Sequence, residues 1–138
     1  MDRLLGRPLR VPYRWLMIAA VVVAAIAHVP VIAPHLDEAP YMGVLFVVLT
    51  LACLILAAAI AIHDSAVVYA LSVLTCGLAV IGYAATRVVA FPMLADDVGN
   101  WWEPLGVVSI VSESIVVIGA LSALVRGRAV AARAGSGI

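Results

Sequence analysis

Four long apolar runs constrain what this chain can fold into more than any other feature of the sequence. The runs cover residues 15–32, 41–62, 66–90 and 101–125, and only short connectors separate them. An α-helix needs roughly 20 apolar residues to cross the hydrocarbon core of a bilayer, so each run is long enough to span a membrane. Short connectors join helices that run in opposite directions. The sequence therefore predicts an all-α, polytopic membrane protein built as an antiparallel bundle of four transmembrane helices.

The composition agrees with a membrane protein. Of the 138 residues, 66% are hydrophobic and 12% are charged, and the mean hydropathy is +1.20. A typical soluble domain is about 45–50% apolar and about 25% charged. We expect one transmembrane domain at residues 15–125, between a basic N-terminal segment at residues 1–14 and a basic C-terminal tail at residues 126–138. Both flanking segments are expected in the cytoplasm, and the tail is expected to be disordered.

The arginines predict the orientation of the bundle. All eight basic residues are arginines, and seven of them flank the apolar runs. They are Arg3, Arg7, Arg10 and Arg14 before the first run, and Arg126, Arg128 and Arg133 after the last. Because positively charged flanks stay on the cytoplasmic side, we expect both termini inside. The link at residues 63–65 is then also inside, and the connectors at residues 33–40 and 91–100 are outside.

Two connector motifs begin the second and fourth runs, HLDEAPYMG at residues 35–43 and DDVGNWWEPLG at residues 96–106. Each places an acidic residue shortly before a proline, a pattern typical of a helix N-terminus. In the second motif Asn100 and Glu103 have the spacing of a capping box. With these motifs, residues 15–125 resemble small four-span membrane proteins of high-GC Gram-positive bacteria. The resemblance implies the four-span fold and a bacterial plasma membrane, and it carries no activity with it.

Three residues that can carry a charge lie deeper inside the predicted spans, namely His28, Arg87 and Glu113, whereas Glu103 lies at the very start of the fourth. A charged side chain at the centre of a membrane helix costs at least about 2.5–3.5 kcal/mol, so such residues face the bundle interior and pair. We expect Arg87 and Glu113 to interact, with His28 close enough to join them. Simpler interpretations stay open. Arg87 could reach the lipid phosphates and His28 could be hydrogen-bonded at the interface, while Ser109 could satisfy a neutral Glu113 carboxyl.

The outer connectors and their neighbours hold side chains that could bind a metal ion. The set comprises His28, His35, Asp37, Glu38, Asp96, Asp97 and Glu103. Mixed histidine and carboxylate ligands suit zinc, iron, manganese or copper(II). The spacing matches no helical metal motif such as H-E-x-x-H. A bis-histidine haem is not expected, because His63 is predicted at the opposite membrane face from the other two histidines.

Three classes of function remain open, and the lipid bilayer is a partner in all of them. The first is cation or metal binding linked to transport. The second is a non-catalytic subunit of a larger membrane complex, or a homo-oligomer. The third is a membrane enzyme that acts on a lipid or quinone with Glu113 or His28 as acid or base, which a cavity opening between spans beside Glu113 would favour.

The sequence favours the first two classes over an enzyme. It contains no G-x-S-x-G, Walker or Rossmann motif, which would indicate a hydrolase or a nucleotide-binding enzyme. It also has no basic stripe with interleaved aromatic residues. We therefore expect no nucleic acid among its partners.

Overall fold

The computed structural model describes residues 2–136, which form five α-helices and one short 3-10 helix. They are α1 (Asp2–Leu5), α2 (Arg14–Glu38), α3 (Pro40–Ile62), α4 (Ala66–Val88), η1 (Ala95–Asp97) and α5 (Pro104–Gly135). The helices α2, α3, α4 and α5 are long and apolar enough to cross a membrane. No β-strand occurs within the described residues. The prediction of an all-helical protein with four helices suited to span a membrane is confirmed.

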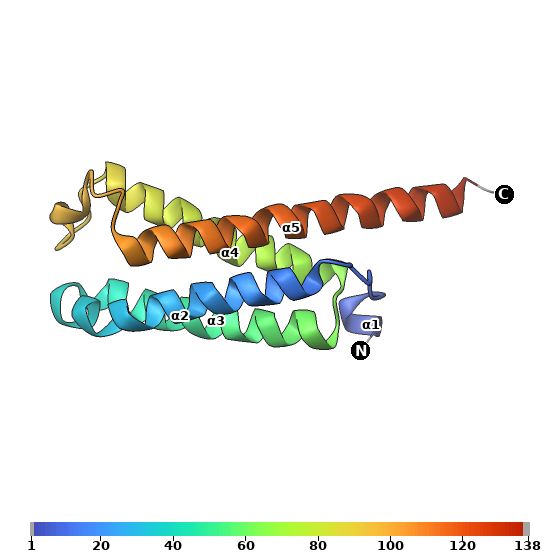
Figure 1. Ribbon diagram of the computed structural model, residues 1–138, viewed down its shortest axis with the longest axis horizontal. Coiled ribbons are helices and arrows are strands. Elements are labelled where there is room, and N and C mark those ends of the chain that lie inside the picture. Colours follow the sequence, from blue (N-terminus) through green and yellow to red (C-terminus); the bar gives the residue numbers. More distant parts are fainter. Residues whose placement is uncertain (1, 137–138) are drawn as a thin grey trace.

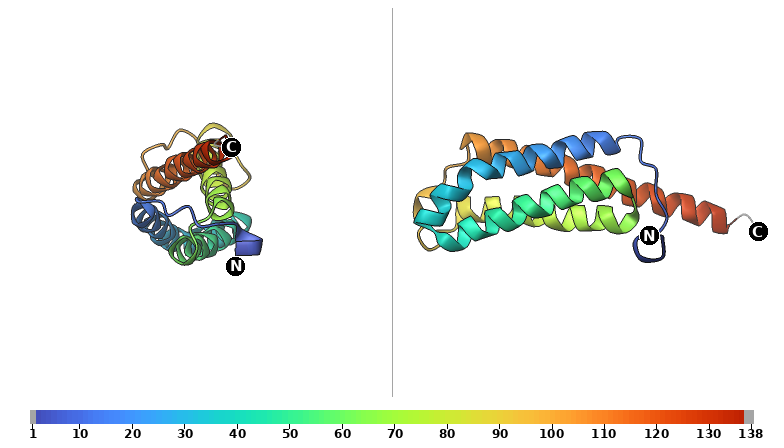
Figure 2. Two further views of the ribbon diagram at one scale, coloured as in Figure 1. Left: turned by 90° about the vertical axis from the view of Figure 1, so that its right-hand side faces the viewer. Right: turned by 90° about the horizontal axis from the view of Figure 1, so that it is seen from below.

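The four long helices lie side by side as a bundle (Figure 1). Seen along the bundle in Figure 2, they follow one another around it in chain order. The helix α2 packs closely against α3 and α5, and α4 packs against α5, whereas α3 and α4 touch only sparsely. Both chain ends lie at one end of the bundle, which we call the terminal end (Figure 1). The segments that join α2 to α3 and α4 to α5 lie at the opposite end, which we call the connector end.

The helix α2 extends past the predicted end of the first span and stops at Glu38. Pro30 and Pro34 lie inside this helix. Proline removes one amide donor from the backbone ladder, a loss that membrane helices tolerate when neighbouring groups satisfy the freed carbonyl. The predicted connector at residues 33–40 is therefore mostly helical, and Asp37 and Glu38 belong to the last turn of α2.

The helix α5 begins at Pro104, and Glu103 caps it. The Glu103 carboxylate accepts hydrogen bonds from the backbone amides of Leu105 and Gly106. These amides are among the donors that a helix start leaves without a partner in the helix. The prediction of a capping box led by Asn100 is wrong, because Glu103 itself occupies the N-cap position.

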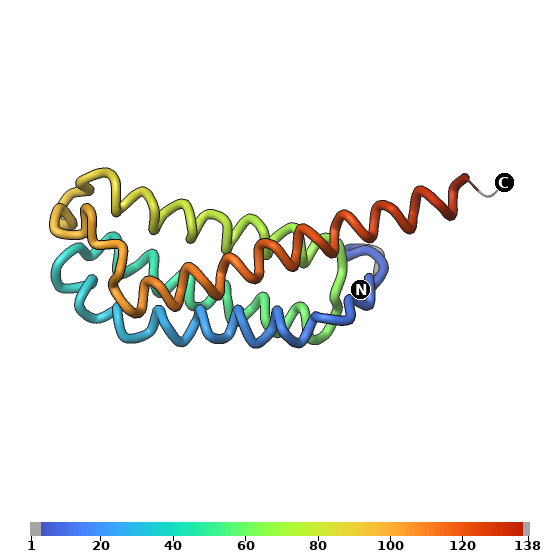
Figure 3. The backbone as a smooth tube through the Cα atoms, turned by 45° about the horizontal axis from the view of Figure 1, so that its top comes forward, coloured from blue at the N-terminus to red at the C-terminus, as the bar shows by residue number. Residues whose placement is uncertain are grey.

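The helix α5 is also longer than the predicted fourth span. It runs to Gly135, whereas the sequence predicts a disordered tail from residue 126. Residues 126–135 are rich in alanine and arginine, which have high helix propensity, and contain no proline to interrupt the helix. The tail is therefore helical as far as Gly135 and projects beyond the other helices in Figure 3. Residues 1, 137 and 138 of the predicted flanking segments lie outside the described part of the chain.

The terminal half of the bundle is filled by side chains from all four long helices. Met17 of α2, Ile60 of α3, Tyr69 of α4 and Ala120 of α5 are fully buried there and belong to one continuous core. In a bilayer, close van der Waals packing of such side chains helps to hold the helices together. The core leaves the connector half of the bundle as the place where space for a ligand remains.

The N-terminal segment is held against the link between α3 and α4 by Asp64, which is buried. The Asp64 carboxylate accepts a hydrogen bond from the Val11 amide at 2.7 Å, and the Asp64 carbonyl accepts one from the Leu9 amide at 2.8 Å. A ring nitrogen of His63 lies 2.7 Å from the Gly6 carbonyl oxygen. These bonds fasten the segment across the terminal end, a role that the sequence did not predict for Asp64.

Candidate functional site

A cavity of about 680 Å³ lies between the helices in the connector half of the bundle. Its volume falls in the range of roughly 300–1,000 Å³ that is usual for small-molecule sites. The walls are mainly apolar and come largely from the first half of α3 and the second half of α4. These are the two neighbouring helices that touch only sparsely. The cavity therefore occupies the space that α3 and α4 leave between them.

The cavity opens sideways between α3 and α4. Leu45 and Val48 of α3 line it and are 55% and 57% exposed, and Leu74 and Leu78 of α4 line it and are 57% and 60% exposed. A side chain that is exposed and also part of the cavity wall marks an opening. Because both helices are apolar enough to cross a membrane, this opening would face lipid.

His28 of α2 and Glu113 of α5 meet at the deep end of the cavity. The His28 Nε2 atom lies 3.4 Å from the Glu113 Oε1 atom and 2.9 Å from the Ser109 Oγ atom. Ser109 and Glu113 are four residues apart and so share one face of α5. The side chains of His28 and Glu113 are only 4% and 2% exposed. The structure thus places a histidine, a carboxyl and a hydroxyl together away from water.

Two polar atoms at the deep end have no hydrogen-bond partner within residues 2–136, namely Glu113 Oε1 and His28 Nδ1. Buried polar atoms are nearly always paired in folded proteins. A buried donor or acceptor left without a partner costs about 1–3 kcal/mol. The Glu113 Oε1 atom lies 3.4 Å from His28 Nε2 without forming a hydrogen bond, so a bound molecule can complete its hydrogen bonding there.

Arg87 stands at the connector end of the cavity and is paired with Asp97. Its Nη1 atom lies 2.7 Å from the Asp97 Oδ1 atom and 3.1 Å from the Asp97 carbonyl oxygen. The guanidinium carbon also lies 4.5 Å from the centre of the Tyr83 ring. The predicted contact between Arg87 and Glu113 is not formed, because the chain turns back after α4 and brings Asp97 to the guanidinium. Arg87 is only 8% exposed, so it does not extend to the lipid phosphates either.

Phe46 of α3 forms an aromatic wall of the cavity beside two histidines. Its ring centre lies 5.6 Å from that of His28 and 4.8 Å from that of His35. The His35 ring bonds its own helix, with Nδ1 2.8 Å from the Val31 carbonyl oxygen. The sequence gives no sign of this position, because Phe46 stands in an unbroken apolar run.

Two tyrosines tie the connector between α4 and α5 to the helices around the cavity. The Tyr41 hydroxyl of α3 donates to the Pro92 carbonyl at 2.7 Å, and the Tyr83 hydroxyl of α4 donates to the Trp101 carbonyl at 2.9 Å. A Cβ atom on Gly106 would collide with the Tyr83 ring. The connector is thereby held beside the end of the cavity.

The predicted metal ligands are not gathered into one site. Among the residues that the structure describes, no three His, Cys, Asp or Glu side chains lie together as a metal ion would need. Asp37, Glu38 and Asp96 are exposed. Asp97 is engaged by an arginine, and Glu103 caps α5. The carboxylates that the sequence placed in a joint site thus have separate surroundings.

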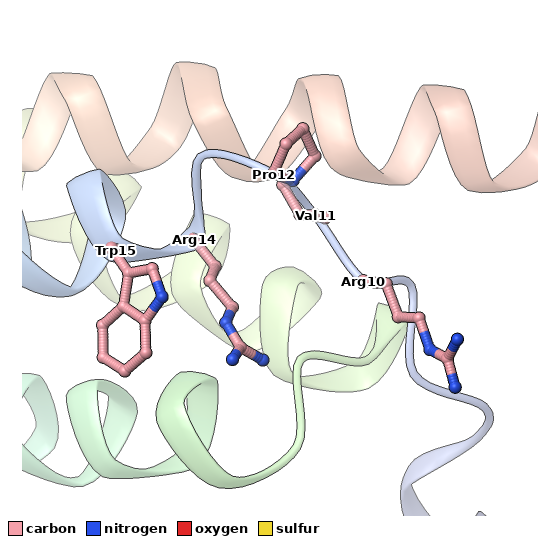
Figure 4. A pocket seen from close by; sticks show the side chains of 5 residues that line it. All are labelled: Arg10, Val11, Pro12, Arg14 and Trp15. Atoms are coloured by element: carbon pink, nitrogen blue, oxygen red, sulfur yellow. The ribbon is translucent and has the colours of Figure 1, made fainter.

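A second hollow lies along the N-terminal segment at the terminal end (Figure 4). It is lined by Arg10, Val11, Pro12, Arg14 and Trp15. In Figure 4 the two arginine side chains leave the segment at separate places, and their guanidinium groups do not converge. This hollow therefore lacks the convergent polar groups of a small-molecule site.

Comparisons of the chain with protein-family models, with curated proteins and with solved structures gave no match. His28, Arg87 and Glu113 all line one cavity, yet they belong to two separate pairs. His28 pairs with Glu113 at the deep end, and Arg87 pairs with Asp97 at the connector end.

Proposed function

We propose that the protein binds a lipid-soluble molecule in the cavity between α3 and α4, inside a bacterial plasma membrane. One observation carries this proposal: the cavity opens sideways between two apolar helices and ends on the buried pair of His28 and Glu113. A molecule with an apolar tail and a polar head can enter such a site from the bilayer. Its tail would lie along α3 and α4, and its head would reach the buried pair.

The proposal includes an orientation in the membrane. The arginines at both ends of the chain favour cytoplasmic termini and an antiparallel bundle. The connector end then lies outside, and the cavity faces the outer leaflet. The acidic connectors fit this side, because the excess of Lys and Arg is what marks a cytoplasmic segment.

A binding site of this kind belongs to the class of membrane proteins that act on a lipid or quinone. Acid–base chemistry at Glu113 or His28 would be its enzymatic form. Cation transport has less support, because the carboxylates of the connectors have separate surroundings and the terminal half of the bundle is packed. The same opening also fits a second function, that of a subunit in a larger membrane complex, because a helix of a partner subunit could occupy it.

Native mass spectrometry of the protein released from mild detergent tests the proposal. We expect a species that carries the mass of one lipophilic molecule, which extraction with organic solvent should recover. Gly82→Phe should empty the site, because Gly82 lines the cavity and a Cβ atom there meets no protein atom within 4 Å. Gly77→Phe is the matched control, since Gly77 lies on the same helix, has equally open surroundings and lies outside the cavity lining.

Neither substitution should unfold α4, because phenylalanine has a higher helix propensity than glycine. Equal retention of the ligand by the two variants would refute the site. A protein that never carries a lipophilic molecule would refute the function. Co-purification of a second membrane protein that Gly82→Phe abolishes and Gly77→Phe preserves would support the partner subunit instead.

A further inference from the structure

We infer that the molecule in the cavity is a quinone or quinol, whose ring lies against Phe46 and whose oxygen forms a hydrogen bond with Glu113. This inference rests on the proposed function, because it names the class of molecule that the cavity takes. Four properties lead to this inference: the depth of the polar pair, the charge balance of the walls, the Glu113 oxygen without a hydrogen bond, and the aromatic wall. The first two disfavour charged lipid heads, the third provides a hydrogen bond, and the fourth favours a flat ring.

The depth of Glu113 favours a neutral head. Glu113 lies nine residues from Pro104 (113 minus 104), which is about 14 Å along α5 at 1.5 Å per residue. A charged group at this depth in a bilayer is strongly disfavoured, whereas a phospholipid keeps its charged headgroup at the interface. A phospholipid could therefore place a tail in the cavity and could not bring its headgroup to the polar pair.

The charges around the cavity also disfavour an anionic head. The arginine in its lining, Arg87, already holds Asp97 at 2.7 Å. The other carboxylate at the connector end, Glu103, is engaged by the first amides of α5. The Arg87 Nε atom has no hydrogen-bond partner among the described residues, but the Asp97 carboxylate already balances the charge of the guanidinium. A phosphate or carboxylate head would thus meet no arginine in the described lining whose charge lacks a counterion.

The Glu113 Oε1 atom can serve both redox forms of a quinone. It is buried, lies in the cavity wall and has no hydrogen-bond partner among the described residues. A carboxylate accepts a hydrogen bond from a quinol hydroxyl, and a carboxylic acid donates one to a quinone carbonyl. A fatty alcohol also carries a hydroxyl, so this bond by itself does not select a ring.

The Phe46 ring favours a ligand whose head is a flat ring. Its ring centre lies 5.6 Å from that of His28, so two ring planes border the deep end of the cavity. Aromatic rings pack on one another by offset or edge contacts that contribute beyond the area they bury. The tail of the molecule would leave through the opening that Leu45 and Leu78 border. A ring head with a long apolar tail therefore fits both ends of the cavity.

Two matched probes test this inference on the delipidated full-length protein. The probes are decyl-ubiquinone and 1-decanol, which carry the same alkyl chain and differ in the ring. We expect isothermal titration calorimetry in detergent to show about threefold to tenfold tighter binding of the quinone, from the ring contact, because 1-decanol can also form the hydrogen bond with Glu113. Phe46→Leu should reduce this preference, since it keeps an apolar side chain and removes the ring.

Variants of Glu113 test the hydrogen bond. Glu113→Met keeps the length of the side chain and removes its oxygens, so quinone binding should weaken roughly fivefold to tenfold. Glu113→Gln keeps a donor and an acceptor and should restore most of the binding. Glu38→Met is the control, because the Glu38 carboxylate is exposed at the end of α2 and outside the cavity lining.

The outcomes separate this inference from the proposed function. Equal binding of the two probes by a protein that carries a lipophilic molecule would overturn the quinone and leave the lipid site standing. Displacement of the carried molecule by dioleoyl phosphatidylglycerol and not by decyl-ubiquinone would overturn it as well. Binding of neither probe by a protein that carries no lipophilic molecule would overturn both. If Glu113→Met does not fold, an unchanged preference in Phe46→Leu still overturns the inference.

Discussion

Removing Asp97 should destabilise the protein more than removing Arg87, although the two residues form one ion pair. The Arg87 side chain is 7% exposed and the Asp97 side chain is 26% exposed. Without Asp97, a buried guanidinium loses the carboxylate that lies 2.7 Å away. Without Arg87, the carboxylate remains partly accessible to water. A charge left buried without a partner is much more costly than one that water can reach.

The expected magnitude lies between those of buried and exposed ion pairs. Removing one partner of a buried pair costs about 3–5 kcal/mol, and an exposed pair contributes about 0–1 kcal/mol. We therefore expect Asp97→Ala to lower the free energy of unfolding by roughly 2–3 kcal/mol and Arg87→Ala by roughly 1–2 kcal/mol. The double substitution should cost less than the sum of the two, because it leaves neither charge without its partner.

Reversible unfolding by SDS in mixed micelles measures these three free energies. Asp96→Ala is the matched control, because Asp96 is the exposed neighbour of Asp97 in η1 and its removal should change the free energy by less than about 0.5 kcal/mol. Strictly additive losses would refute the pair. An Asp96→Ala variant as unstable as Asp97→Ala would refute the assignment of the partner.

Three further predictions concern other parts of the molecule. Asp64→Ala should let trypsin cut the N-terminal segment several times faster, because it removes the acceptor of a buried amide. Gly106→Ala should lower the free energy of unfolding in SDS by about 1–3 kcal/mol, because the added methyl group collides with the Tyr83 ring. A cysteine at Ala95 should react with an impermeant maleimide added to intact cells, and one at Ser136 should not, since the connector end is proposed to lie outside.

Each of these predictions has a control or a contrary outcome. Asp37→Ala removes an exposed carboxylate and should leave the rate of trypsin cleavage unchanged. If trypsin cuts Asp64→Ala no faster than Asp37→Ala, the Asp64 hydrogen bonds do not hold the N-terminal segment in place. Gly77→Ala adds a methyl group in open space, so a Gly106→Ala protein that matches its stability would show that the tyrosine ring moves aside. Labelling of Ser136 from outside would reverse the orientation.

The sequence by itself determined the number and kind of the long elements. In hydrocarbon every backbone amide and carbonyl must find a partner within the protein, so an apolar run of spanning length forms a helix. The four runs accordingly became α2, α3, α4 and α5. The start of α5 is equally local. Pro104 takes the first position of the helix, and the Glu103 carboxylate accepts hydrogen bonds from amides two and three residues away. Spacing predicted a capping box led by Asn100, whereas the structure has Glu103 itself at the N-cap.

Only the tertiary structure decided which polar groups meet and where space remains. Spacing along one helix shows that Ser109 and Glu113 share a face, but the rotation of α2 against α5 decides that His28 faces them. The path of the chain after α4 decides that Arg87 meets Asp97. The cavity exists because α3 and α4 stand apart while each packs on another helix. Apolar side chains that face lipid and apolar side chains that face a cavity look alike in a sequence, and this is why the position of Phe46 could come only from the packing of the four helices together.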